Sequence, residues 1–358
     1  MKIFNKLFQI LQYASPELRR RLFFLLLCLF FLNGSVWAVG IILSLKQKVF
    51  LGLIVLAYGL GLRHAVDADH IAVIDNTTRK LMQEGKRPVA VGFFFSLGHS
   101  TIVILLSILA AVSAAFVKNH LPEVQHVGTV IGTAISSGFL LMIGIINLLV
   151  LIDIVKIWKS VTSGGEYDEV ELYEYLNNRG LVARILKPFL RSVTSSWHMY
   201  TVGLLFGLGF DTASEVALLS ISAATGANGL PFIAILVLPL AFTAGMSLID
   251  TLDGILMLGA YGWAYFKPIR KLYYNMNITF LSVVIALFIG GIEGIQVLSI
   301  EFKLNGRFFE IVKNIDFANL GYIIIGTFIA SWLFSLMYYK YKKYDYIDAK
   351  KAKYKRKK

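Results

Sequence analysis

Long apolar runs separated by short polar connections make up almost the whole chain. A run of about 20 apolar residues is long enough to cross the hydrocarbon core of a bilayer as a helix. The pattern therefore predicts an all-α fold, a polytopic membrane helix bundle with about eight transmembrane helices. The expected spans cover residues 22–45, 49–74, 88–117, 127–155, 198–226, 231–260, 272–300 and 319–338.

One of these spans changes character in its middle. Residues 49–62 carry no charge, and the sequence RHAVDADHI follows directly at residues 63–71. A charge at the bilayer centre costs about 2.5–3.5 kcal/mol on insertion scales, so ionisable groups that remain there usually face a cavity, a partner or an ion. Arg63 therefore needs a neutralising acid, and the histidines and aspartates beside it mark a candidate functional site.

Composition supports the membrane interpretation and fixes an orientation. The chain is 57% hydrophobic and 16% charged, and its mean hydropathy is +0.68. If the N-terminus is cytoplasmic, the inside segments hold 28 Lys and Arg against 6 outside, with Arg63 left within a span. Positive residues favour the cytoplasmic side, so both termini are expected there. This asymmetry also explains the net charge of +13 through topology and contact with membrane lipid, and no nucleic-acid partner is expected.

The predicted domain organisation is simple. Residues 1–358 form a single integral membrane domain, with a large cytoplasmic loop at 156–197 and a basic cytoplasmic tail at 340–358. The chain contains no GxxxxGK[ST] motif, and no ATPase subunit is evident. Its one cysteine, Cys28, excludes a disulfide framework and a thiolate metal site built from this chain alone.

The residues of the second span suggest a metal site. On an ideal helix, which turns about 100° per residue, His64, Asp67 and His70 form one stripe. Imidazole and carboxylate donors suit a divalent transition metal such as nickel, cobalt, zinc or iron(II). Asp69 lies about 140° from His64 and would point elsewhere unless the helix is irregular. Gly59 would permit a break near residues 59–66.

Further polar residues interrupt later spans. His99, in the third span, is a candidate ligand of the same site, although a hydrogen-bonded structural histidine is the alternative. The fifth and sixth spans contain acids that could guide cations, relay protons or pair with Arg63, or could hydrogen-bond between helices. These acids are Asp211, Glu215, Asp250 and Asp253, with Glu293 in the seventh span as a further candidate.

Two short motifs recur. YGLGLRHAVD at 58–67 resembles FGLGFDTASE at 206–215, and GHS at 98–100 resembles GMS at 245–247. Because the copies are three spans apart, they would run in opposite directions through the membrane. The pattern thus predicts an inverted repeat, which in transporters places the binding site at the repeat interface.

The motifs RHAVDADHI, LGHS, LGFDTASE and GMSLIDTLDG, in this order, make the chain similar to the nickel/cobalt transporter family, the bacterial high-affinity nickel permeases. The resemblance covers nearly the whole chain. It implies uptake of Ni²⁺ or Co²⁺ across the bacterial inner membrane, with His64, Asp69, His70 and His99 at motif positions and Val66 as a candidate for selectivity. Ser214 stands where the family motif has threonine.

The resemblance stresses Asp69 and the helix geometry stresses Asp67, so both remain candidate ligands. It implies a permease that is not an enzyme and has no cofactor. Another divalent metal (Zn, Fe or Mn) and, less favoured, an intramembrane metalloenzyme remain as alternatives, although no HExxH motif is present. The choice between nickel and cobalt, the energy source and the oligomeric state stay open at this stage.

Overall fold

The computed structural model describes residues 15–112, 114–162, 193–209, 212–227, 232–264, 268–315 and 317–342. Every regular element in these ranges is a helix, which confirms the predicted all-α class. The helices are α2 (Pro16–Lys46), α3 (Val49–His64), α4 (Ala68–Gln83), α5 (Val91–Val112), α6 (Ala114–Thr162), η1 (Ser196–His198), α9 (Met199–Phe206), α10 (Ala213–Ala227), α11 (Phe232–Ala264), α12 (Pro268–Glu301), α13 (Arg307–Lys313) and α14 (Phe317–Tyr341).

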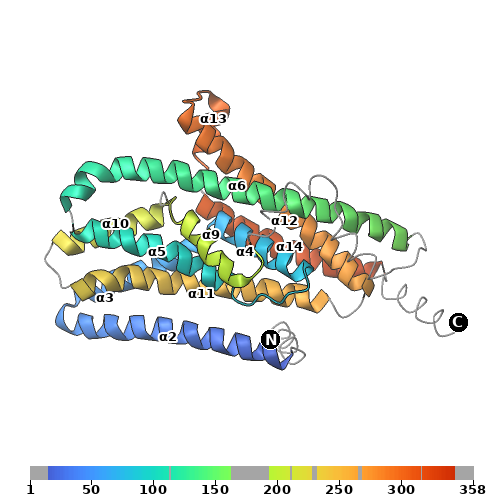
Figure 1. The fold of residues 1–358 in the computed structure, drawn as a ribbon, viewed down its shortest axis with the longest axis horizontal. Helices are drawn as coiled ribbons and strands as arrows, with labels where there is room; N and C mark the ends of the chain where they lie inside the picture. The colour runs from blue at the N-terminus through green and yellow to red at the C-terminus, as the bar shows by residue number, and fades with distance from the viewer. Residues whose placement is uncertain are drawn as a thin grey trace.

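The long helices lie side by side in a bundle (Figure 1). Within the described residues, six helices are long and apolar enough to cross a membrane, or seven if α3 and α4 count as one bent span. The protein is therefore a multi-pass membrane protein. The expected fifth span, at 198–226, consists of two short helices, α9 and α10, neither of which is long enough to cross alone. Most of the predicted loop and tail, residues 163–192 and 343–358, lies outside the described residues.

The second span is broken, as its sequence predicts, but the break falls at residues 65–67, at the end of the expected range of 59–66, and Gly59 lies in regular helix. Helices α3 and α4 meet there at a bend of 55°. The second helix then continues to Gln83, nine residues beyond the predicted end of the span. Arg79 and Lys80, expected in a cytoplasmic connection, are instead buried in α4, because the bend carries its polar end between other helices.

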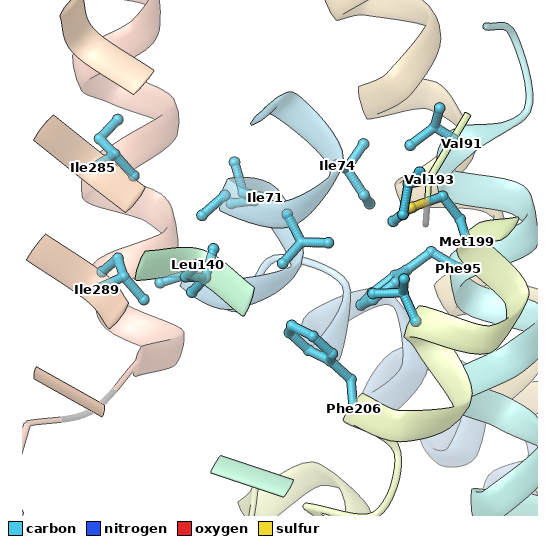
Figure 2. Packing of buried hydrophobic residues seen from close by; sticks show 14 of the residues in the cluster. Ile71, Ile74, Val91, Phe95, Leu140, Val193, Met199, Phe206, Ile285 and Ile289 are labelled. Atoms are coloured by element: carbon cyan, nitrogen blue, oxygen red, sulfur yellow. The ribbon is translucent and has the colours of Figure 1, made fainter. Parts of the chain in front are cut away.

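Helix α4 lies at the centre of the bundle. Figure 2 shows Ile71 and Ile74 of α4 between Ile285 and Ile289 of α12 on one side and Phe95 of α5 on the other. All of these side chains belong to one buried apolar cluster. The cluster holds a helix of mixed polarity away from lipid, so its polar side chains face protein rather than hydrocarbon.

Glycines set two close helix crossings. A Cβ atom on Gly61 of α3 would overlap the backbone oxygen of Phe242 of α11. A Cβ atom on Gly203 of α9 would overlap the backbone oxygen of Phe95 of α5 in the same way. Small residues let helix backbones approach closely in membranes, where packing rather than a hydrophobic driving force holds helices together.

The two crossings are copies of each other. Gly98 of α5 packs against Tyr200 and Leu204 of α9, just as Gly245 of α11 packs against Tyr58 and Leu62 of α3. Each matched residue of α3 precedes its equivalent in α9 by 142 positions in the sequence. Each matched residue of α5 precedes its equivalent in α11 by 147 positions. The matched residues are Tyr58 and Tyr200, Gly61 and Gly203, Leu62 and Leu204, Phe95 and Phe242, and Gly98 and Gly245.

The second copy is inverted. Helices α5 and α11, which are equivalent, run antiparallel, because Gly92 packs against Asp250 while Ser96 hydrogen-bonds Ser247 at 3.1 Å. Helices α3 and α9 also end alike, since the residues after them, Ala65 and Gly207, have nearly the same φ and ψ.

The packing corrects the register of the repeat. The motif alignment pairs Tyr58 with Phe206, whereas the crossings pair Tyr58 with Tyr200, a shift of six residues. Helix α9 ends at Phe206 and α10 begins at Ala213, so the two helices are separated by three more residues than α3 and α4 are. The glycine-rich motif misleads here because Gly207 and Gly209 follow the end of α9, whereas the residue of α9 that matches Gly61 is Gly203.

The remaining helices flank this core. Helices α6 and α12 pack along each other, and Ser137 Oγ donates a hydrogen bond of 2.7 Å to the Gly290 carbonyl. The backbone of Val66, in the α3–α4 break, is covered by Gly321 of α14. The short α13 projects beyond the bundle at the end of α12 (Figure 1).

We predict that Gly61→Ala and Gly203→Ala destabilise the protein, because a methyl group at either crossing must displace a backbone oxygen. Overpacking of this kind typically costs about 1–3 kcal/mol. Gly59→Ala, in the same helix as Gly61 but with open space around it, is the matched control. Thermal unfolding of the detergent-purified variants measures the effect, and equal midpoints for Gly61→Ala and Gly59→Ala would contradict it.

Candidate metal centre

Three histidines from three helical segments meet at the α3–α4 break. His64 ends α3, His70 lies in the first turn of α4 and His99 lies in the middle of α5. One nitrogen of each ring lies within 4.8 Å of the other two. Each of the three residues is at most 3% exposed, so the cluster is sealed from solvent and lipid. The break makes the arrangement possible, because it lets His64 and His70 of one bent span approach His99 of α5 together.

Glu215, from the first turn of α10, joins this cluster. Its Oε1 lies 2.9 Å from His99 Nε2 and 3.8 Å from His64 Nε2, and the two Nε2 atoms are 3.0 Å apart. Thr212 Oγ1 donates a hydrogen bond of 2.9 Å to the other carboxylate oxygen and so orients it. Three imidazole nitrogens and one carboxylate oxygen therefore converge on one buried point.

Two aspartates contact the Nδ1 atoms of two of the imidazole rings. Asp67 Oδ2 lies 3.1 Å from His64 Nδ1, and Asp250 Oδ2 lies 3.3 Å from His70 Nδ1. A carboxylate at Nδ1 places the ring proton there and leaves the Nε2 lone pair free to bind an ion. His70 Nε2 is buried and has no hydrogen-bond partner among the residues that the structure describes.

The two aspartates of the DADH sequence have different positions. Asp67 is 1% exposed and contacts His64. Asp69 Oδ1 instead accepts a hydrogen bond of 2.9 Å from the backbone N–H of His70. Of the two candidates, Asp67 thus contacts an imidazole directly, while Asp69 caps the first turn of α4 and adds negative charge near the rings.

Arg63 does not have the acidic partner expected for it among the described residues. Its Nη1 donates a hydrogen bond of 2.8 Å to Ser214 Oγ, which joins the α3–α4 break to the start of α10. Ser214 is the position where the resemblance leads us to expect threonine, and the serine hydroxyl serves equally well as the acceptor. Asp211, another candidate partner, lies outside the described residues.

Three further candidate residues lie at other contacts of the bundle. Asp253 is one turn beyond Asp250 on α11. Glu293 of α12 accepts a hydrogen bond of 2.7 Å from Ser136, which places it at the α6–α12 interface. Val66 packs against the apolar cluster around α4. Of these three, only Asp253 lies on a helix that also contributes a side chain to the histidine cluster.

The sequence analysis missed a group of buried polar residues on α4. Asp75, Asn76, Thr77, Thr78 and Arg79 follow the histidine motif and are at most 1% exposed. A signal was present, since DNTTRK directly continues a helical segment. It was assigned to a connection because a straight second span of ordinary length ends near residue 74.

The fold and the site define a class: a polytopic helical membrane protein that buries a cluster of imidazoles and carboxylates where its inverted halves meet. The family model described as "High-affinity nickel-transport protein" (NicO) matches residues 50–338. The chain belongs to this family, which is one of transporters rather than enzymes. No solved structure matches the chain.

Curated relatives agree with this assignment. The high-affinity nickel transport protein of Cupriavidus necator is 49% identical over 334 residues, covering 93% of this chain and 95% of the relative. The NixA nickel-transport protein of Helicobacter pylori strain J99 is 49% identical over 292 residues, with 80% and 88% covered. The cobalt transport protein NhlF of Rhodococcus rhodochrous is 43% identical over 289 residues, with 79% and 81% covered.

We predict that Asp67→Asn and Asp250→Asn each lower equilibrium Ni²⁺ affinity about 10–100-fold, because a carboxylate that orients a ligating imidazole contributes about that much. Calorimetric titration of the purified protein measures the affinity. Glu293→Gln, which changes a buried carboxylate at the α6–α12 interface, is the control and should bind as the unmodified protein does. Unchanged affinity in both aspartate variants would show that these acids do not orient metal ligands.

Proposed function

We propose that this protein takes up Ni²⁺ or Co²⁺ across the bacterial cytoplasmic membrane, with both termini on the cytoplasmic side. The observation that carries the proposal is the convergence of His64, His70 and His99, sealed from solvent, within 4.8 Å. Relatives named for nickel and for cobalt transport support the same two ions.

We propose Glu215 as the fourth ligand of the bound ion. Nitrogen donors with one carboxylate suit borderline divalent ions, and the carboxylate partly neutralises the charge. A dehydrated divalent cation at this depth needs such compensation, because the surrounding bundle is apolar. Asp67 and Asp250 would then orient the His64 and His70 rings, each through a contact with the Nδ1 atom of its ring.

The apposition of two imidazole nitrogens supports a cation site. His64 Nε2 and His99 Nε2 are 3.0 Å apart, and two lone pairs at this distance repel unless a proton or a metal ion lies between them. The carboxylate of Asp67 at His64 Nδ1 favours the ring proton on that nitrogen, and in this tautomer His64 Nε2 faces His99 as an acceptor. A centre with this many acceptors is stabilised by a cation.

We propose secondary transport driven by the membrane potential. One elementary charge crossing 100 mV gains about 2.3 kcal/mol, so inward movement of a divalent cation is strongly favoured by a negative interior. The inverted halves, with a break in each at the binding site, provide the geometry that alternating access requires.

The test is uptake of radiolabelled Ni²⁺ and Co²⁺ into proteoliposomes with an imposed potential, negative inside. We expect His64→Ala, His70→Ala and His99→Ala to reduce uptake at submicromolar metal to background, because no neighbouring group can replace a missing nitrogen. Glu293→Gln serves again as the control. If all three histidine variants transport normally at equal protein levels, the site assignment is wrong.

A further inference from the structure

The crossing of α5 and α11 buries four hydroxyl side chains close to His99. Ser96 and Ser100 lie one turn apart on α5, and Thr243 and Ser247 lie one turn apart on α11. All four residues are at most 3% exposed. A hydroxyl that is removed from water destabilises a protein unless it has a partner, so the way in which these four groups pair bears on the conformation of the crossing.

The inverted repeat makes the four hydroxyls two copies of one pair. The shift of 147 positions that relates α5 to α11 relates Ser96 to Thr243 and Ser100 to Ser247. Because α5 and α11 run antiparallel with Ser96 opposite Ser247, a step of four residues along each helix brings Ser100 opposite Thr243. The helices stay packed beyond this second pair, since Val103 of α5 belongs to one buried cluster with apolar residues of α11.

The two copies differ in their hydrogen bonds. The hydroxyl oxygens of Ser96 and Ser247 are hydrogen-bonded to each other at 3.1 Å. Ser100 Oγ, in contrast, is buried without a hydrogen-bond partner in the part of the chain that the structure describes. Thr243 Oγ1 is turned onto its own helix, where it donates a hydrogen bond of 2.8 Å to the Pro239 carbonyl. One copy of the pair is therefore closed and the other is open.

The closed pair lies toward the cytoplasm in the topology proposed above. With the N-terminus inside, α5 runs outward, so Ser96 lies on the cytoplasmic side of His99 and Ser100 lies on its outer side. Gly92, one turn before Ser96, brings the α5 backbone against the backbone oxygen of Asp250. The crossing is thus tight on its cytoplasmic side, where Ser96 and Ser247 form the cytoplasmic pair, whereas Ser100 and Thr243 form the outer pair.

We propose that the cytoplasmic pair and the outer pair are alternating latches of the transport cycle. The cytoplasmic pair holds the inner side of the crossing closed in this structure, and it opens when the outer pair forms. The proposal rests on the proposed function and topology. Inverted halves rock against each other about a fixed site, and for two equivalent pairs on opposite sides of that site, a motion that separates one pair brings the other together. Ser100 then gains the partner that it lacks, as Thr243 exchanges the Pro239 carbonyl for Ser100.

Loss of one latch shifts the two states in a defined direction. Ser247→Ala removes the partner of Ser96 and leaves the outer pair intact, so it raises the population in which the outer pair is closed. A hydrogen bond between membrane helices changes such a balance by a factor of about 3–20. Ser107→Ala removes another buried hydroxyl of α5, beyond the outer pair, and is the matched control. A serine that only fills the core would give the same result as this control.

The experiment measures disulfide formation within each pair in the full-length protein in proteoliposomes. Cys28 is the chain's one cysteine, so Cys28→Ser gives a background in which Ser96→Cys with Ser247→Cys, or Ser100→Cys with Thr243→Cys, can be oxidised by diamide. We expect the cytoplasmic pair to cross-link faster than the outer pair in metal-free protein. Adding Ser247→Ala should speed cross-linking of the outer pair about 3–20-fold. Each disulfide should stop Ni²⁺ uptake, and reduction with dithiothreitol should restore it.

The outcomes separate the latches from the proposed function. Absence of Ni²⁺ and Co²⁺ uptake by the unmodified protein would contradict the function, whereas the cross-linking rates need no uptake. The latches are wrong if Ser247→Ala changes cross-linking of the outer pair no more than Ser107→Ala does, or if protein with the cytoplasmic pair oxidised transports as fast as reduced protein. If Ser247→Ala does not fold, Ser96→Ala removes the same hydrogen bond from the other helix and carries the same expectation.

Discussion

The structure depends on one constraint: ionisable groups inside a membrane bundle must be shielded from lipid and given partners. The histidine centre meets this constraint by combining three imidazole rings with three carboxylates. These are Asp67 in the α3–α4 break, Glu215 of α10 and Asp250 of α11. Each ring has an acid on one side, and each of these acids is at most 1% exposed. The long apolar helices outside this centre serve to keep both water and lipid away from it.

Helix breaks satisfy the same constraint. A continuous second span would place its histidines on one stripe facing a single neighbour, whereas the break at 65–67 turns His70 toward α5 and α11. The equivalent break before α10 brings Thr212 and Glu215 to the same point. Irregular backbone at membrane depth is tolerated where it lines an interior site rather than lipid, and here both breaks border the histidine cluster.

The two halves share geometry but differ in chemistry. The matched glycine crossings hold α3 on α11 and α9 on α5 in the same way. The first half contributes all three imidazoles, and the second half contributes Glu215 and Asp250. His99 corresponds to Met246 in the second copy, so symmetry places the site between the halves without requiring equivalent ligands. In the proposed site, the first half would supply the nitrogen donors together with Asp67, and the second half would supply the carboxylates of Glu215 and Asp250.

The sequence by itself determined the helical class, the membrane setting and the interrupted second span, and it singled out the three histidines that meet at the α3–α4 break, because long apolar runs and rare intramembrane charges leave few alternatives. It did not determine the register of the repeat, since glycine-rich motifs match equally well six residues apart and only the backbone contacts of Gly203 and Gly61 decide between them. Nor could it show that Asp67 rather than Asp69 reaches an imidazole, or that Arg79 is buried rather than in a connection. Both outcomes follow from a bend of 55°, and the direction of such a bend depends on which neighbouring helices fill the space on each side.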